Sequence, residues 1–309
     1  MSPVDAETAP HTAVVDGREE VCCPTCGAAE TSRLVFQRVD GHAIRQCRGC
    51  GLMFVSPRLT HTKLAAIYEQ DDYSQGLLFE NFSYDRWKRE PQFNACATTS
   101  SKVKEMLIDL VSDYLPAGAR LFDVGCGFGL TVLEARHRGF VADGIDISEH
   151  RLRIARERIG VDLRHGRLEE AGLPEASYDG VIFWDVLEHV HNPLNILGEI
   201  HRIMRSGGYL FGQVPNWRGL SNRLKTFLNR HGFARKQFKH FGIPHHVCLF
   251  DERSLRRMLQ RAGFELVYCR SWSKLKYKTL SSPWERTFYR LLERRRLTDY
   301  ITFVGQTIR

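Results

Sequence analysis

The sequence contains no apolar run that could cross a bilayer. A membrane-spanning helix needs ~20 consecutive, mostly apolar residues, and no segment of the 309-residue chain approaches that length. Residues 1–20, MSPVDAETAPHTAVVDGREE, also lack the basic-then-apolar pattern of an export signal, and their polar composition predicts a disordered tail. These absences argue against an integral membrane protein or a secreted protein and predict a cytoplasmic location.

Because no export signal is present, the nine cysteines are expected to be reduced and to bind metal or pack in the core. Four of them form two C-x2-C pairs with 20 residues between the pairs: Cys23 with Cys26, and Cys47 with Cys50. The spacing favours Cys23 over the adjacent Cys22. The intervening segment RLVFQRVDGHAIRQ predicts a hairpin that turns at Asp40–Gly41. Residues 21–60 are therefore expected to form a zinc ribbon whose zinc is structural, since four thiolates complete its coordination.

The segment LFDVGCGFGLT, residues 121–131, predicts a ligand loop between a strand at 120–124 and a helix at 130–139. A second strand ends at Asp146, whose carboxylate is suited to a ribose diol. The loop departs from the dinucleotide pattern G-x-G-x-x-G, and Asp123 would repel a pyrophosphate but suits an ammonium group. Adenosine with a cationic amino-acid tail fits both features, which predicts S-adenosylmethionine (SAM) as the ligand.

Five segments occur in the order, and at roughly the spacing, of the class I SAM-dependent methyltransferases: DVGCGFG, GIDIS, YDGVIFWDVLEHV, MRSGGYLFGQVPN and SLRRMLQRAGFELV. The chain resembles this family over about residues 100–309. The resemblance implies the following cofactor-binding residues: Asp123, Gly125, Cys126, Gly127, Asp146, Ile147, Leu168 and Asp185. It departs at 166–169, where Gly-Arg-Leu-Glu stands in place of the family's Gly-Asp, so the Leu168 backbone or Glu169 is expected to meet the adenine.

The remaining pattern predicts an α/β protein. Strands near 161–164, 179–184 and 207–214 alternate with helices at 148–158 and 192–205, after a lead-in helix at 100–115. The resemblance adds an antiparallel last strand at 300–308, which gives a Rossmann-like, seven-stranded methyltransferase fold with a small N-terminal zinc ribbon. The expected segments are a helical linker at 61–100, a methyltransferase domain at 101–309 and a helical insertion at 273–298.

Candidate catalytic residues follow the fourth strand, in the segment WDVLEHV. His189 is the first candidate for a general base, with an ordinary pKa of ~6.5 that would give the rate a low-pH limb. His245 and His246 are the second candidates. Two other interpretations stay open. Glu188 and His189 would brace the loop, or Asp185, Glu188 and His189 would bind a divalent metal, as in some quinone-precursor O-methyltransferases with a similar motif.

The net charge of +8 is concentrated in one region. Residues 201–250 contain nine Lys or Arg, five His and no Asp or Glu. Much of this charge falls in residues 216–242, the basic cap, which is interleaved with aromatic residues. In the family this connection commonly covers the acceptor site. The basic cap is expected to hold a phosphate-bearing acceptor, such as a lipid- or nucleotide-linked glycan, or to lie on an anionic membrane.

A zinc ribbon before a methyltransferase domain resembles bacterial enzymes that act on sugars and other small biosynthetic intermediates. The expected function is therefore SAM-dependent methyl transfer to a small or carrier-linked, sugar-derived or phosphate-bearing acceptor. The alternative is an RNA-modifying or RNA-binding protein that uses the zinc ribbon and the basic cap, because basic grooves with interleaved aromatics bind single strands. Nucleic acid is the less favoured partner, since nothing in the sequence resembles a known RNA-binding module.

Overall fold

The computed structural model describes residues 12–27, 32–38, 41–64, 66–67, 79, 81–90, 99–231, 233, 241–273 and 283–308. Within these residues, no helix is both long and apolar enough to cross a membrane. Three sheets are present in the described chain, and the largest one carries the candidate site.

The central sheet has seven strands in the order β13-β14-β11-β10-β7-β8-β9. Their bounds are β7 (Arg120–Val124), β8 (Val141–Asp146), β9 (Arg164–His165), β10 (Tyr178–Trp184), β11 (Met204–Pro215), β13 (Phe264–Trp272) and β14 (Tyr300–Thr307). Only β14 runs antiparallel to its neighbours, between β11 and β13. This topology confirms the predicted Rossmann-like methyltransferase fold, including the antiparallel last strand.

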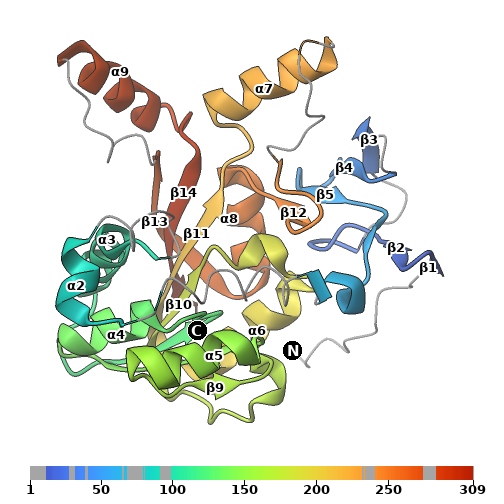
Figure 1. Ribbon diagram of the computed structural model, residues 1–309. Coiled ribbons are helices and arrows are strands. Elements are labelled where there is room, and N and C mark those ends of the chain that lie inside the picture. The colour runs from blue at the N-terminus through green and yellow to red at the C-terminus, as the bar shows by residue number, and fades with distance from the viewer. Residues whose placement is uncertain are drawn as a thin grey trace.

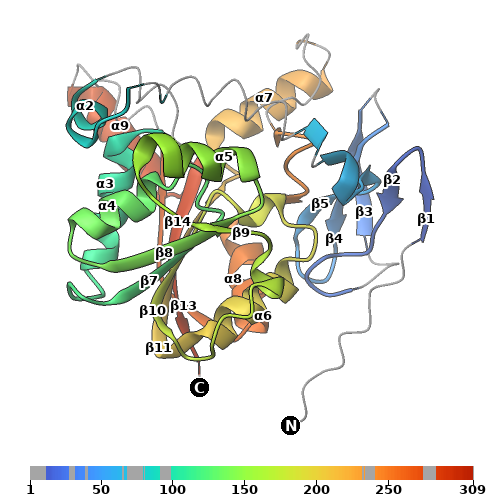
Figure 2. The same cartoon turned by 60° about the horizontal axis from the view of Figure 1, so that its bottom comes forward.

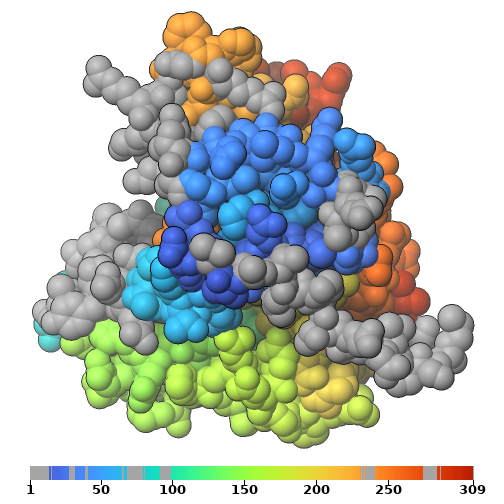
Figure 3. Space-filling view, turned by 90° about the vertical axis from the view of Figure 1, so that its right-hand side faces the viewer, coloured from blue at the N-terminus to red at the C-terminus, as the bar shows by residue number. Residues whose placement is uncertain are grey.

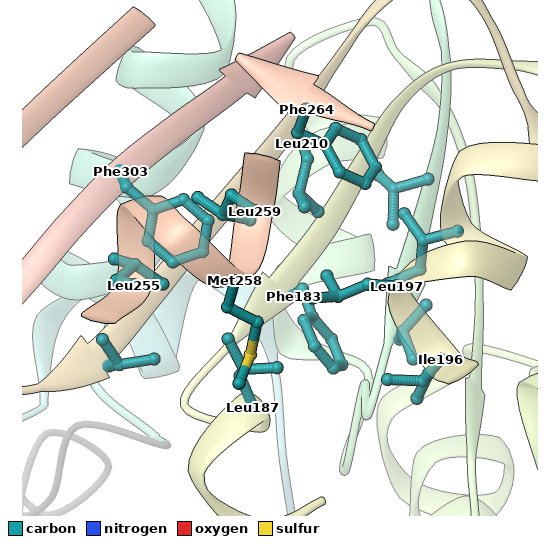
Figure 4. Packing of buried hydrophobic residues seen from close by; sticks show 14 of the residues in the cluster. Phe183, Leu187, Ile196, Leu197, Leu210, Leu255, Met258, Leu259, Phe264 and Phe303 are labelled. Carbon is teal, nitrogen blue, oxygen red and sulfur yellow. The ribbon is translucent and has the colours of Figure 1, made fainter. Parts of the chain in front are cut away.

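Helices cover both faces of the central sheet (Figure 1). On one face lie α6 (Pro193–Ile203) and α8 (Glu252–Arg261), and on the other lie α3 (Ser101–Ser112), α4 (Leu130–His137) and α5 (Glu149–Ile154). Because side chains alternate along a strand, Phe183 of β10 packs on the first face and Ile182 on the second. Figure 4 shows the first face, where sheet residues meet both helices: Phe183, Leu210, Phe264, Leu197, Met258 and Leu259.

Two predicted elements differ from the structure. The helix expected at 148–158 divides into α5 and a π-helical turn, η3 (Ala155–Ile159), which ends at Gly160 with φ 81°. The strand expected at 161–164 is reduced to the two-residue β9. It lies at the sheet edge and pairs only with Ile145 and Asp146, so little backbone pairing is available to extend it.

The N-terminal part forms two small sheets. One contains β1 (Thr12–Val15), β2 (Arg18–Glu20) and β6 (Arg58–Leu59), and the other contains β3 (Ser32–Gln37), β4 (Ala43–Cys47), β5 (Met53–Val55) and β12 (Cys248–Leu249). The prediction of a disordered tail to residue 20 is corrected for residues 12–20, which pair as the hairpin β1–β2. Pairing of Arg18 and Glu19 with β6 provides the tertiary contact that composition did not reveal.

The second small sheet joins the N-terminal part to the methyltransferase part. The predicted hairpin is present as the antiparallel pair β3–β4, although Asp40 lies outside the described residues. Strand β12, which follows the basic cap in the chain, pairs with β5. Figures 1 and 2 both show the N-terminal strands beside the central sheet, on the side opposite α3 and α4. Figure 3 shows their residues, in blue, lying against the larger part of the molecule.

Three further helices lie in regions singled out by the sequence. In the expected linker, the structure has α2 (Tyr84–Arg89), with most of the rest outside the described residues. The basic cap contains α7 (Leu220–Arg230), and the expected insertion contains α9 (Pro283–Arg294). Residues 234–240 and 274–282 lie outside the described residues.

Candidate active site

A cavity of about 740 Å³ opens at the carboxyl ends of the parallel strands. This is where ligands bind in open α/β sheets, and the volume falls in the usual range of ~300–1,000 Å³ for small-molecule sites. The glycine loop, the ends of β8 and β10, and the N-terminal part all contribute to its wall. One continuous space therefore lies between the methyltransferase part and the N-terminal part.

The glycine loop is held open toward the cavity by backbone conformation and one carboxylate. Gly125 and Gly127 have φ values of 76° and 55°, which favour glycine. A Cβ on Gly125 would lie 2.6 Å from the Val186 side chain. The Asp146 carboxylate accepts from the Gly127 N–H at 2.7 Å and from the Ser148 N–H at 2.9 Å. Asp146 thus orders the loop, while its remaining lone pairs are available for a diol.

Asp123, expected beside the methionine part of the cofactor, is buried beneath the cavity. Lys104 of α3 is the charged neighbour that lines the cavity itself. Burial raises the pKa of Asp123 to about 7, and the Lys104 charge opposes that rise. Asp123 would therefore attract a cationic ligand through its charge, from a buried position outside the cavity wall.

The other expected cofactor residues all line the cavity. Ile147 is 51% exposed and offers a flat apolar surface, while Leu168 and Cys126 are buried in the wall. Asp185 has φ 55°, an uncommon conformation for a non-glycine residue, and its carboxylate accepts from Gln213 Nε2 at 2.8 Å. A glycine cradle, a carboxylate at the end of β8 and an apolar surface beside it suit the amino-acid, ribose and adenine parts of SAM.

His189 lies in the short helix η5 (Leu187–His189), directly after β10. Its Nδ1 lies 3.1 Å from the backbone oxygen of His245. Since a carbonyl oxygen only accepts, Nδ1 carries the proton and Nε2 keeps its lone pair. Nε2 lies 3.9 Å from Glu188 Oε1. The loop at 241–247 also contacts η5 through a backbone hydrogen bond, in which the Val247 N–H donates to the backbone oxygen of Glu188 at 2.8 Å.

His189 and His246 are neutral at physiological pH. Burial, followed by the charge of His246, lowers the pKa of His189 to about 3, and burial lowers the pKa of His246 to about 4. The expected pKa of ~6.5 for His189 is corrected accordingly. His246 lines the cavity and its ring lies 4.8 Å from that of His189, whereas His245 contributes its backbone oxygen to His189.

Three side chains of the site could hold a metal ion. Ligand atoms of Glu188, His189 and His246 all lie within 4.8 Å of one another. Glu188 is buried, and its Oε2 has no hydrogen-bond partner among the described residues. Burial and the Asp185 charge raise the pKa of Glu188 well above its ordinary value. A cation would remove the cost of that buried carboxylate. The structure thus groups His246 with Glu188 and His189, where the sequence suggested Asp185.

The sequence did not identify the residues that the N-terminal part contributes. Arg58 is buried and donates from Nε to Glu19 at 2.8 Å and from Nη1 to the backbone oxygen of His191 at 3.0 Å. The His61 ring lies 5.4 Å from the His191 ring at an interplanar angle of 45°, and Arg167 Nη2 lies 2.6 Å from Nε2 of His61. All five line the cavity. The segment SPRLT contains Arg58, but the sequence could not reveal the contact of Arg58 with His191, because the two residues lie 133 positions apart.

The four expected metal-binding cysteines lie together in the N-terminal part. Within the described residues, the Sγ atoms of Cys23, Cys26, Cys47 and Cys50 lie within 4.8 Å of one another, with closest pairs at 3.3 and 3.4 Å. A tetrahedron with ~2.3 Å zinc–sulfur bonds has edges of ~3.8 Å, so the cluster is close to that geometry. The hydrogen bond between Cys23 and Cys50 lowers the pKa of Cys50 to about 5 and raises the pKa of Cys23, because one thiolate accepts a hydrogen bond from the other thiol.

The two C-x2-C turns have the same backbone form. In each, the glycine after the second cysteine has positive φ, 68° at Gly27 and 83° at Gly51. Each glycine N–H donates to the backbone oxygen of the first cysteine, Gly27 to Cys23 at 2.8 Å and Gly51 to Cys47 at 3.0 Å. The sequence C-x2-C-G thus specifies each turn, and the chemistry of four clustered thiols fits a structural zinc ion.

Comparisons with known proteins agree with this fold. A "Ubiquinone biosynthesis O-methyltransferase" of Hahella chejuensis is 31% identical over 156 residues, covering 48% of this chain and 63% of that protein. A "Probable S-adenosylmethionine-dependent methyltransferase" of Mycolicibacterium smegmatis is 31% identical over 153 residues, covering 48% and 53%. The chain thus spans less than two thirds of either relative's length.

A solved structure, a SAM-dependent methyltransferase from Archaeoglobus fulgidus, has a TM-score of 0.51 at 18% identity and covers 71% of this chain and 97% of its own, which shows the fold. The family described as "Methyltransferase domain" matches residues 99–268, which contain the glycine loop, Asp146 and His189. Because this match spans more than half of the chain, the protein belongs to the methyltransferase-domain family.

Proposed function

We propose that the protein transfers a methyl group from SAM to a small or carrier-linked, sugar-derived acceptor. The observation that carries the proposal is the continuous cavity between the glycine loop and the N-terminal part. One end offers the groups that suit SAM, and the other end is polar, with Arg58, His61, Asn192 and Asn195 in its wall. Several donors and acceptors in one pocket suit a ligand with several hydroxyl groups.

When bound, SAM supplies an activated methyl group, so the protein must mainly align the acceptor and exclude water. The glycine loop and Asp146 would hold the cofactor, and Lys104 lies at the cavity wall beside the buried Asp123. The residues of β6 and the segment after it would position the acceptor. The zinc bound by the four cysteines would be structural, holding the N-terminal wall in place.

A hydroxyl acceptor must also lose its proton. The Nε2 lone pair of His189 is oriented by the bond from Nδ1–H to the His245 oxygen, and the low pKa keeps it unprotonated. His189 is therefore proposed as the group that accepts this proton. Its weak basicity means that proton transfer would accompany methyl transfer rather than precede it.

A second candidate acceptor is a phenolic hydroxyl group of a quinone precursor. It is favoured by the names of the relatives and by the arrangement of Glu188, His189 and His246, which suits a divalent cation. Such a cation would lower the pKa of a bound hydroxyl group. In this alternative His189 is a ligand and the base lies elsewhere.

Incubation of the protein and methyl-labelled SAM with cell extract, followed by mass spectrometry, tests the proposal. A labelled sugar nucleotide or glycolipid is expected, and the label should be absent with His189→Gln. A labelled quinone precursor would favour the second candidate, and labelled RNA would support the RNA-modifying alternative. Absence of any labelled product, with SAM bound, would contradict methyl transfer by this chain.

A further inference from the structure

Helices α7 and α9 each expose an apolar stripe with the same spacing. Leu220, Leu224 and Phe227 lie on α7, and Trp284, Phe288 and Leu291 lie on α9, so both follow the pattern i, i+4, i+7. Residues at this spacing share one helix face. All six side chains are at least 40% exposed. Each helix therefore presents to solvent the face that a globular helix normally buries.

This exposure is concentrated in one part of the molecule. Of the thirteen exposed large apolar side chains among the described residues, seven lie at 220–233 or 284–291. These seven include every exposed Phe and Trp in the described chain: Phe227, Phe233, Trp284 and Phe288. Clustered exposed apolar surface of this kind indicates a binding surface.

The two helices share one base. The Leu220 N–H donates to the Leu297 oxygen at 2.7 Å, and Ser221 Oγ is hydrogen-bonded to Asp299. The start of α7 is thus fixed to the segment that follows α9. Figure 1 shows both helices projecting from the same end of the molecule, and Figure 3 shows α7, in orange, above the N-terminal part. The two helices therefore start from one region of the molecule.

The charges around the stripes are mainly positive. Arg223 and Lys225 are exposed on α7, a helix without Asp or Glu, and Arg290, Arg294 and Arg295 are exposed at the end of α9 and just beyond it. The acidic residues of α9 are Glu285 and Glu293, and Glu293 lies 3.2 Å from Arg270. In a two-fold contact between copies, the same basic patch would face itself, which costs free energy. The charge therefore favours an anionic partner.

The aliphatic part of the stripes distinguishes between anionic partners. Nucleic acid would reward stacking on Phe227 or Trp284 but gives no comparable gain for Leu220, Leu224 and Leu291. A bilayer interface rewards both, because Leu, Phe and Trp enter the headgroup and acyl boundary while Lys and Arg meet anionic lipids.

We propose that α7 and α9 form one docking surface for an anionic lipid bilayer. The start of α7 and the segment after α9 lie near the cavity, because Pro215 and Tyr300 line the cavity, pair with each other, and stand five residues before α7 and six residues after α9. Docking would bring the cavity to the bilayer surface, where a lipid-linked acceptor is available. The proposed docking of α7 and α9 on a bilayer does not depend on which acceptor is methylated.

Flotation of the full-length protein with vesicles tests the proposal. We expect binding to vesicles of equal parts phosphatidylcholine and phosphatidylglycerol, weaker binding to phosphatidylcholine alone, and release by salt. Leu224→Ser with Phe288→Ser should weaken binding by about tenfold or more, since two apolar contacts are lost. Arg223→Gln with Arg294→Gln should reduce binding to the anionic vesicles and its salt dependence.

The matched control is Leu34→Ser with Val141→Ser, which removes two equally exposed apolar side chains outside the surface. It should bind vesicles like the wild type, and all variants should keep the wild-type circular dichroism and melting temperature. Equal binding by the control and the α7–α9 variants would overturn the proposal. Sedimentation showing a dimer that Leu224→Ser with Phe288→Ser dissociates, without vesicle binding, would identify the surface as a contact between copies instead.

Discussion

The Asp146 carboxylate accepts a hydrogen bond from the backbone N–H of Gly127 at 2.7 Å, across the width of the glycine loop. The residue proposed to bind the ribose is therefore also the one that holds the loop in its ligand-binding conformation. The end of β8 and the loop after β7 consequently act as one unit. Changes at Asp146 should affect every part of SAM that the loop contacts.

Replacing Asp146 with Ala should weaken SAM binding by roughly 1–3 kcal/mol, the scale of a lost hydrogen bond to a charged group. Isothermal titration calorimetry measures the change. Asp143→Ala is the matched control, because Asp143 lies on the same strand, β8, but pairs with Arg164. Equal SAM affinity of the wild type and the Asp146 variant would show that the carboxylate has no part in binding.

Asp123→Asn should change the pH dependence of stability. The folded-state pKa of about 7 lies above the unfolded value of ~3.9, so the stabilising contribution is complete below pH ~4 and is lost as the pH rises through 7. An amide has no such dependence. The unfolding free energy of the variant relative to the wild type should therefore rise from pH 4 to pH 8, by on the order of 1–4 kcal/mol.

Urea denaturation at several pH values measures this difference. The exposed Asp162, changed to Asn, serves as the control and should show no comparable trend. A difference between Asp123→Asn and the wild type that does not vary with pH would mean that Asp123 titrates normally in the folded protein.

One zinc ion per chain is expected from elemental analysis of protein purified without chelators. Cys47→Ser with Cys50→Ser should abolish binding and unfold the N-terminal part, since metal-binding free energy contributes to folding. Cys22→Ser should retain zinc, because Cys22 is not one of the four clustered cysteines, although its neighbour Cys23 is. Zinc retained by the double variant would exclude the proposed ligand set.

His189→Gln should lower the methyl-transfer rate by ~10²–10⁴ while SAM affinity stays nearly unchanged. Because the pKa of His189 is about 3, this residue should add no low-pH limb to the wild-type rate between pH 5 and 8. A small rate loss together with weaker SAM binding would indicate that His189 only braces the loop.

Activity in the presence of a chelator separates the base from the metal ligand. If Glu188, His189 and His246 bind a catalytic cation, a chelator that leaves the cysteine-bound zinc in place should abolish activity, and magnesium or manganese should restore it. If His189 is the base, activity should persist in the chelator. Elemental analysis of the treated protein provides the control for retained zinc.

The sequence predicted the central sheet well because each strand there carries its own apolar pattern and the family order fixes their arrangement. The glycine loop and the residues after β10 were likewise predictable, since local motifs specify them. The prediction was poorer where tertiary contacts decide the structure. Residues 12–20 have a polar composition, yet they pair with β6, and β9 is shortened by its edge position.

The acceptor side of the cavity could not be predicted for the same reason. Arg58 contacts Glu19 and the His191 oxygen, which lie 39 and 133 residues away in sequence. A single sequence gives no sign of such contacts. The pKa of His189 was also unpredictable, because it depends on burial and on His246, which arrives from a loop 57 residues further along the chain.

The pairing of β5 with β12 means that the methyltransferase part cannot be treated as a detachable enzyme. A chain that begins at residue 99, where the family match begins, would lack β5 and leave β12 without its partner strand. It would also lack Arg58 and His61, which line the cavity. The backbone bonds from Val55 N–H to Val247 O, 3.0 Å, and from Val247 N–H to Glu188 O, 2.8 Å, continue from β5 to η5, which carries His189. In the shortened chain, the cavity would lack its N-terminal wall, and the segment that carries His246 would lose its backbone bond to β5.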